Sequence, residues 1–429
     1  MGPVGSVIIG PIMRAAMMII SVLQSETSLF PKKKNIKMVL PRSVAKLLHH
    51  RLSSEFAGLD KSSTLLQLQP GQNESIKYKV FAGTWNVGGI APPDDLDLKN
   101  WLDLDTTAGS CDIYVLGFQE IVPLNARNVL GPKKRSAAMK WNSLIADALN
   151  NTRRRRRQGG GGGAMSGSRE AAQSQRHQDQ DVFRRVTSKQ MVGIFVSVWA
   201  RSALRRHVRH LAVSCVRAGV LGLLGNKGAV TVRFVLQGTS FCFVCCHLSS
   251  GSDEGDVLLR NADVGSILSR TRFHGRGSTE AEASQELPLP KKILHHDRVV
   301  LLGDLNYRIA MDTTTLVRTR KWSMLLENDE LLLELSKGRR FDGWHEGLVT
   351  FAPTYKYHRN SDKFYWCADG ADRGRHRNSK QHRAPAWCDR ILWRGDGMMQ
   401  TRYESCGGYR LSDHRPVRAV FHSVCEVAK

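Results

Sequence analysis

The sequence lacks any hydrophobic run long enough to cross a lipid bilayer, which takes roughly 20 apolar residues. The best candidate, "AAMMIISVL" after Arg14, is too short. Acidic residues are also scarce, because 39 Asp and Glu stand against 63 Lys and Arg, which leaves a formal net charge of +24. We therefore expect a soluble or peripheral protein whose surface attracts polyanions, such as nucleic acid, acidic membrane leaflets or phosphorylated substrates.

Cysteine provides no evidence of a disulfide framework. The count is nine, an odd number, and most of these residues lie in apolar runs such as "FCFVCCHL", which is typical of thiols in a reducing compartment. Cys242 and Cys245 form a CxxC pair, but a strand would point them to opposite faces, so we expect core packing rather than a zinc site. We interpret the protein as cytoplasmic and peripheral at membranes.

Two segments lack the hydrophobic periodicity of a packed domain. Residues 1–75 are expected to form an N-terminal extension that is largely disordered or loosely packed. Residues 152–181 combine five successive arginines with a glycine run, which predicts a disordered insertion. The arginines could contact anionic lipid or nucleic acid, or form only a solvated loop. The remaining residues, 76–424, are expected to fold as one domain.

Apolar runs of β type alternate with helical runs over this domain. The runs 208–219, 228–237 and 239–249 follow one another with only short turns, which predicts antiparallel neighbours. Helical patterns cover 256–270 and a long region at 316–338. An α/β architecture of two sheets packed face to face, with helices outside, fits this mixture.

Polar residues with chemical capability stand repeatedly at the ends of the predicted strands. A single Asp at such an end is usually a turn or cap residue, and a single His is usually a surface group. Six such endings in one chain predict instead that strand termini from two sheets converge on one polar cleft. The endings hold Asn86, Gln119 with Glu120, His247, Asp304 with Asn306, Asp389 with Arg390, and Asp413 with His414.

These residue types fit hydrolysis of a phosphate ester assisted by a metal. The carboxylate of Glu120 and the amide of Asn86 offer the hard oxygen ligands that suit Mg²⁺. Asp304 can orient or deprotonate an attacking water. Asn306, two residues further along the strand, points to the same face and can donate to a phosphoryl oxygen.

Two histidines complete the predicted set. His247 and His414 can hold the non-bridging phosphoryl oxygens and stabilise the charge that develops in an in-line displacement. Asp389 can orient His414 through its second ring nitrogen.

At this point the motifs resemble those of a known family. The stretches "TWNVGG", "GFQEIVPLNARNVLG", "LGNKGAV", "CHLSSG", "GDLNYRI", "FAPTYKY", "PAWCDRILW" and "SDHRPV" occur in the order seen in inositol polyphosphate 5-phosphatases, and the chain is most similar to the plant members. The resemblance covers about residues 80–421. It implies a four-layer α/β sandwich, a catalytic domain over 76–424, and removal, dependent on Mg²⁺, of the 5-phosphate from phosphoinositide lipids, soluble inositol polyphosphates, or both.

The resemblance also implies residue roles. Glu120 matches the metal ligand, supported by Asn86. Asp304 and Asn306 match the pair that activates water and binds phosphate, Asp389 and His414 match the coupled acid and histidine, and His247 matches a second histidine that binds phosphate. The residues predicted to bind substrate are Tyr355, Lys356 and Arg383 at the 4-phosphate, together with Lys227 and Arg390.

Alternatives remain at this stage. Lys227 could meet the diester phosphate of the substrate or membrane headgroups, or be only an exposed lysine in a tight glycine turn. The chain could be a nuclease of the same superfamily, for which its basic surface would be a footprint, although the inositide motifs lead us to expect no nucleic acid partner. It could also be an adaptor that binds acidic lipids without turnover. The oligomeric state is left open.

Overall fold

The computed structural model describes residues 75–104, 110–123, 136–158, 182–218, 226–253, 255–273, 289–310, 319–365 and 384–427. All of them belong to one compact unit, Leu66–Lys429. The predicted N-terminal extension lies almost wholly outside the described residues, as do 159–181 of the predicted insertion.

The first sheet is built around a parallel pair of strands, β1 (Ser75–Asn86) and β2 (Ile113–Gln119). Every residue of β2 is buried, as expected for a central strand covered on both faces. The spatial order is β11-β12-β1-β2-β4-β3, and the other neighbours pair antiparallel. The outer strands are β3 (Phe183–Met191), β4 (Ile194–Arg201), β11 (Met398–Ser405) and β12 (Val417–Glu426).

The second sheet repeats this pattern around its own parallel pair, β7 (Thr239–His247) and β8 (Arg298–Asp304). Its order is β5-β6-β7-β8-β10-β9, again with antiparallel neighbours elsewhere. The remaining strands are β5 (Val208–Arg217), β6 (Gly228–Leu236), β9 (His345–Glu346) and β10 (Asp389–Arg394).

An apolar core fills the space between the two sheets. Val80 and Val115 from the first sheet belong to the same buried cluster as Phe243 and Leu302 from the second. Cys245 also lies in this cluster, whereas Cys242 packs on the opposite face of β7. The expectation that the CxxC pair serves as core is therefore confirmed, and no cysteine in the described part of the chain forms a disulfide.

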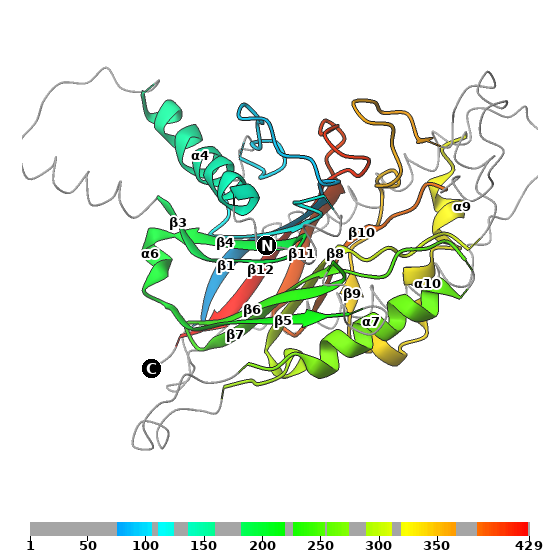
Figure 1. Cartoon of the computed structure of the whole chain (residues 1–429). Helices are drawn as coiled ribbons and strands as arrows, with labels where there is room; N and C mark the ends of the chain where they lie inside the picture. The colour runs from blue at the N-terminus through cyan, green and yellow to red at the C-terminus, as the bar shows by residue number, and fades with distance from the viewer. Residues whose placement is uncertain are drawn as a thin grey trace, which may run out of the picture. The chain divides into compact units, whose positions relative to one another are not determined.

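Helices cover the outer faces of the two sheets (Figure 1). Helix α4 (Ser136–Gln158) packs Trp141 against the first sheet and includes the first residues of the predicted insertion. Helix α7 (Asp256–Arg270) packs Ile267 against the second. The predicted α/β sandwich, with two mixed and mainly antiparallel sheets and helices outside, is confirmed.

The long helical region predicted at 316–338 is wrong. From 319 onward it contains two short helices, α9 (Trp322–Leu326) and α10 (Glu330–Ser336). Asp329 separates them because its carboxylate caps α10 by accepting from the backbone N–H of Leu332 at 3.0 Å.

The other short elements are α6 (Ser202–Arg205) and the 3₁₀ helices η2 (Ile293–His295) and η3 (Arg339–Phe341). Across the described ranges, no helix combines the length and the apolar character needed to cross a membrane.

Candidate active site

The two parallel strand pairs deliver their carboxyl ends to one place. In the first sheet Asn86 lies opposite Gln119, with Glu120 following, and in the second His247 lies opposite Asp304. Strand β10 runs antiparallel to β8, which sets its first residue, Asp389, opposite Asp304. His414, in the loop before β12, reaches the same group. The structure thus brings together Asn86, Glu120, His247, Asp304, Asp389 and His414.

Asp304 is the centre of this group, with only 1% of its surface exposed. Its Oδ2 lies 2.9 Å from Asn86 Nδ2, 3.3 Å from His247 Nε2 and 4.0 Å from His414 Nε2. Burial alone would raise the pKa of Asp304. The hydrogen bond from His247 and the charges of His414, His247 and Lys227 outweigh burial and hold this pKa well below its usual range. Asp304 is therefore ionised in the fold.

Glu120 stands at the open side of the group. Its side chain is 27% exposed, and its Oε1 lies 3.3 Å from Asn86 Nδ2 and 3.8 Å from His247 Nε2. The Asn86 Oδ1 accepts from the backbone N–H of Gly88 at 3.0 Å, so the amide nitrogen faces both carboxylates. In this structure the amide nitrogen of Asn86 orients Glu120 and Asp304, while its oxygen is held by the backbone N–H of Gly88.

Asp389 and His414 form a buried hydrogen-bonded pair. His414 Nδ1 lies 2.8 Å from Asp389 Oδ2, which also accepts from Thr354 Oγ1 at 2.7 Å. Burial lowers the pKa of His414, but the charge and hydrogen bond of Asp389, together with Asp304, outweigh it and raise this pKa to about 9. His414 is therefore an imidazolium at neutral pH.

Lys227 belongs to the same group rather than to an exposed turn. Its Nζ lies 2.6 Å from His247 Nε2. Burial lowers the pKa of Lys227 to about 8, against the opposing effect of Asp304 and Glu120. The ammonium group adds positive charge to the site next to His247.

The carboxylates can hold a divalent cation. Asp304, Asp389 and His414 place one potential ligand atom each within 4.8 Å of one another. A protonated His414 cannot bind a metal, however. Asp389 Oδ2 accepts from His414 and Thr354, which leaves only Oδ1 without a hydrogen-bond partner. Among the carboxylates of the group, Glu120 is the accessible one, and with its neighbour Asp304 it offers hard oxygen donors that fit a divalent cation.

Of the residues predicted to bind substrate, Tyr355 lies beside the site and packs its ring 4.6 Å from that of His414. Lys356 is half-buried, with Nζ 4.7 Å above the ring of Tyr365. Arg383 lies outside the described residues.

Arg390 does not reach the cleft, so the prediction that it binds substrate is not supported. Its side chain is fully buried. Nε and Nη2 donate to Glu346 at 2.6 Å, and Nη1 donates to Asp329 at 2.9 Å. We reassign Arg390 as the ion-paired anchor that holds β10 against β9 and the start of α10.

Three contributors to the site were missed from the sequence. Thr354 supports Asp389, Arg308 donates to Asn306 Oδ1 at 2.6 Å, and Trp85 Nε1 donates to the backbone carbonyl of His414 at 3.3 Å. Arg308 carried a signal, because it stands two residues after Asn306 in "GDLNYRI". Thr354 and Trp85 carried none, since each acts through a partner distant in the sequence.

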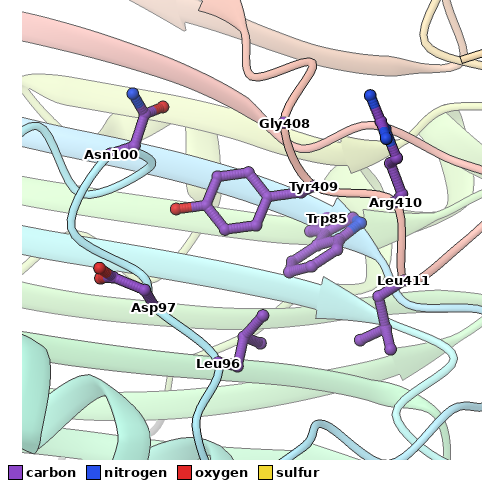
Figure 2. A pocket seen from close by; sticks show the side chains of 8 residues that line it. All are labelled: Trp85, Leu96, Asp97, Asn100, Gly408, Tyr409, Arg410 and Leu411. Atoms are coloured by element: carbon purple, nitrogen blue, oxygen red, sulfur yellow. The ribbon is translucent and has the colours of Figure 1, made fainter. Parts of the chain in front are cut away.

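A cavity of about 440 Å³ is lined in part by Trp85. Figure 2 shows the ring of Tyr409 beside that of Trp85 in its wall, and the two ring centres are 5.5 Å apart. None of the ionisable residues gathered around Asp304 lines this cavity, so the chemistry takes place elsewhere. The lining residues are Trp85, Leu96, Asp97, Asn100, Gly408, Tyr409, Arg410 and Leu411.

Known proteins are similar to this chain in sequence over most of its length. The family model Endonuclease/Exonuclease/phosphatase family 2 matches residues 83–420. Type IV inositol polyphosphate 5-phosphatase 9 of Arabidopsis thaliana is 48% identical over 392 residues, which cover 87% of this chain and 85% of that protein. Type I inositol polyphosphate 5-phosphatase 8 of the same plant is 45% identical over 372 residues, with coverages of 84% and 74%.

A solved structure is similar as well. It is the inositol polyphosphate 5-phosphatase domain of SPsynaptojanin in complex with inositol (1,4)-bisphosphate and calcium ion. It matches with a TM-score of 0.64 at 28% sequence identity, covering 89% of this chain and 92% of that one.

Proposed function

The chain belongs to the inositol polyphosphate 5-phosphatases, as its motifs led us to expect, and we propose that it hydrolyses the 5-phosphate of phosphoinositide lipids and soluble inositol polyphosphates by in-line attack of water. The observation that carries this proposal is the meeting of Glu120, Asp304 and His414, from three distant parts of the sequence, within one buried polar group.

Each protein group has a role that follows from its environment. Asp304 is ionised and buried, so it can accept a hydrogen bond from the attacking water and align that water with phosphorus. The His414 imidazolium and the Lys227 ammonium present positive charge to the phosphoryl oxygens as their charge grows, and His247 lies beside both Lys227 and Asp304. Asn306 adds an amide N–H.

Glu120 and Asp304 would hold a divalent cation, for which we propose Mg²⁺. Both offer hard carboxylate oxygens, and Asn86 holds them in place by donating to each. When bound, this cation neutralises negative charge on the phosphoryl group and polarises its oxygens. Calcium accompanies the ligand in the SPsynaptojanin complex, which supports a divalent cation at this site.

The substrate is proposed to carry a phosphate at position 4 of the ring. The inositol (1,4)-bisphosphate bound by the SPsynaptojanin domain keeps a 4-phosphate and has no 5-phosphate, as a product of this reaction would. Tyr355 packs against His414, and we propose that it meets the neighbouring phosphate together with Lys356, the next residue in the sequence, and Arg383.

The net charge of +24 supports approach to anionic membranes. We therefore propose peripheral contact with cytoplasmic membrane surfaces, where lipid substrates are presented. No nucleic acid partner is proposed.

The test is phosphate release by the full chain in Mg²⁺ from a panel of ring and lipid inositol phosphates, with and without the 4-phosphate, beside duplex DNA. We expect release from inositides that carry a 5-phosphate. Asp304→Ala should abolish turnover while binding to vesicles that contain the lipid substrate changes little. Cleavage of DNA without phosphate release from any inositide would overturn the proposal.

A further inference from the structure

Arg308 is a buried cation beside the reaction site that forms no ion pair with any carboxylate of the described residues. Its side chain follows β8 and is 7% exposed. Within the described ranges no acidic group lies within ion-pair distance of its guanidinium, and Nε and Nη1 hydrogen-bond to no acceptor. The other buried arginines near it differ, since Arg260 pairs with Glu330 at 2.7 Å and Arg390 pairs with two carboxylates. An uncompensated buried charge is costly, so a function that uses it is expected.

The contacts of Arg308 are with residues of the reaction site. Nη2 donates to Asn306 Oδ1 at 2.6 Å. The guanidinium carbon lies 4.8 Å from the ring centre of Tyr355, and that ring in turn packs 4.6 Å from His414. Arg308 thereby connects the amide and the imidazolium that serve the phosphoryl group.

The contact with Asn306 decides which way that amide faces. An arginine can only donate, so the amide atom that it meets must be the oxygen. On the other side Asn306 Nδ2 donates to the backbone carbonyl of Leu248 at 3.1 Å, which can only accept. Because Oδ1 and one N–H of the Asn306 amide are engaged in this way, its second N–H is available to donate to a substrate oxygen. The flipped amide would present an acceptor to an anion.

We propose that Arg308 is a positioning residue of the phosphoryl site: it locks the Asn306 amide with its N–H toward the substrate and lends its positive charge to the anion bound there. The inference rests on the proposed function for its substrate, although the geometry requires only an oxyanion in the site. Loss of the guanidinium should lower kcat far more than it raises KM, because charge on the phosphoryl oxygens grows toward the transition state.

The test compares Arg308→Met with Arg260→Met in the full chain. Arg260 is the matched control, because it is also buried and lies 5.6 Å over the ring of Tyr307, yet does not touch Asn306. We expect Arg308→Met to lower kcat on a soluble inositol trisphosphate by ~100-fold or more and to raise KM by only ~10-fold. Arg260→Met should melt at a lower temperature but keep kcat within ~3-fold when corrected for the folded fraction.

Two further measurements separate positioning from folding. Arg308→Met combined with Asn306→Ala should lower kcat by less than the product of the two single effects, because both changes remove one interaction. Calorimetric titration with inorganic phosphate should show affinity at least ~10-fold weaker in Arg308→Met than in the wild type.

An unchanged phosphate affinity in Arg308→Met, or a kcat loss no larger than that of the folded Arg260 control, would overturn the inference. The phosphate titration needs no turnover. Failure of the wild type to release phosphate from any inositide would therefore remove the proposed function and leave the test of Arg308 intact.

Discussion

Asp389→Asn should move the alkaline limit of activity to lower pH. The change removes the charge that keeps His414 protonated, while the asparagine oxygen can still accept from His414 Nδ1. A pKa of about 9, against the ordinary 6.5, corresponds to ~3 kcal/mol in favour of the imidazolium. Without the Asp389 charge, burial pulls the pKa of His414 down and only the charges of Asp304 and Asp413 oppose it, so we expect a value near or below the ordinary one.

The size of the effect depends on pH. At pH 8 a pKa of about 9 leaves roughly nine-tenths of His414 protonated, whereas a pKa of 6.5 leaves roughly one-thirtieth. We therefore expect kcat/KM of Asp389→Asn to fall ~30-fold at pH 8 and to stay within ~10-fold of the wild type at pH 5.5. The assay is phosphate release from a soluble inositol trisphosphate between pH 5 and 10 at saturating Mg²⁺.

Thr354→Val is the control for this prediction. It removes the hydroxyl that donates to Asp389 Oδ2 at 2.7 Å but keeps the carboxylate charge, so the alkaline limit should move little. If Asp389→Asn lost activity equally at every pH, with its alkaline limit where the wild type has it, the assignment of His414 as the cation of the site would be refuted.

Three further outcomes are expected. Glu120→Gln keeps the shape of the side chain without its charge, so calcium affinity should weaken by at least ~10-fold, or ~1.4 kcal/mol, in a calorimetric titration, and unchanged affinity would place the metal elsewhere. Arg390→Met leaves the carboxylates of Asp329 and Glu346 buried without a cation, so urea denaturation should show a free energy of unfolding lower by ~3–5 kcal/mol. The raised pKa of His414 stabilises the fold fully below pH 6.5 and is lost as pH rises through about 9, so Tm should fall over that range more steeply in the wild type than in Asp389→Asn.

The central strands could be predicted from the sequence because strands buried on both faces consist of continuous apolar runs. Strands β7 and β8 are examples, with nearly every residue buried. Strands β3 and β11 were not predicted, and both lie at the edges of the first sheet. Few of their residues are fully buried, and they include Arg184, Arg185 and Arg402, so these strands carry little hydrophobic pattern and form because they pair with a neighbour.

In the candidate site, too, some residues could be predicted from the sequence and others could not. Asp304 and His247 could be found because each ends an apolar run, and strand ends are where a sheet presents functional groups. The role of Arg390 could not be predicted from the sequence. The residues around it in the sequence do not distinguish an arginine that faces a ligand from one that pairs with buried carboxylates, here Asp329 and Glu346. Asn86 was placed correctly, but the direction of its amide depends on the backbone N–H of Gly88.

The pairing of β1 with β12 has a consequence for how the protein is made. Ser75 lies opposite Glu426, so the first strand of the described domain finds its outer neighbour only among the final residues of the chain. While the ribosome is still extending the polypeptide, that side of β1 is an open edge, and His414 has not yet been brought to Asp304. A nascent chain that ends before His414 lacks this part of the site, and a premature stop before β12 would leave β1 with an unprotected edge that invites aggregation.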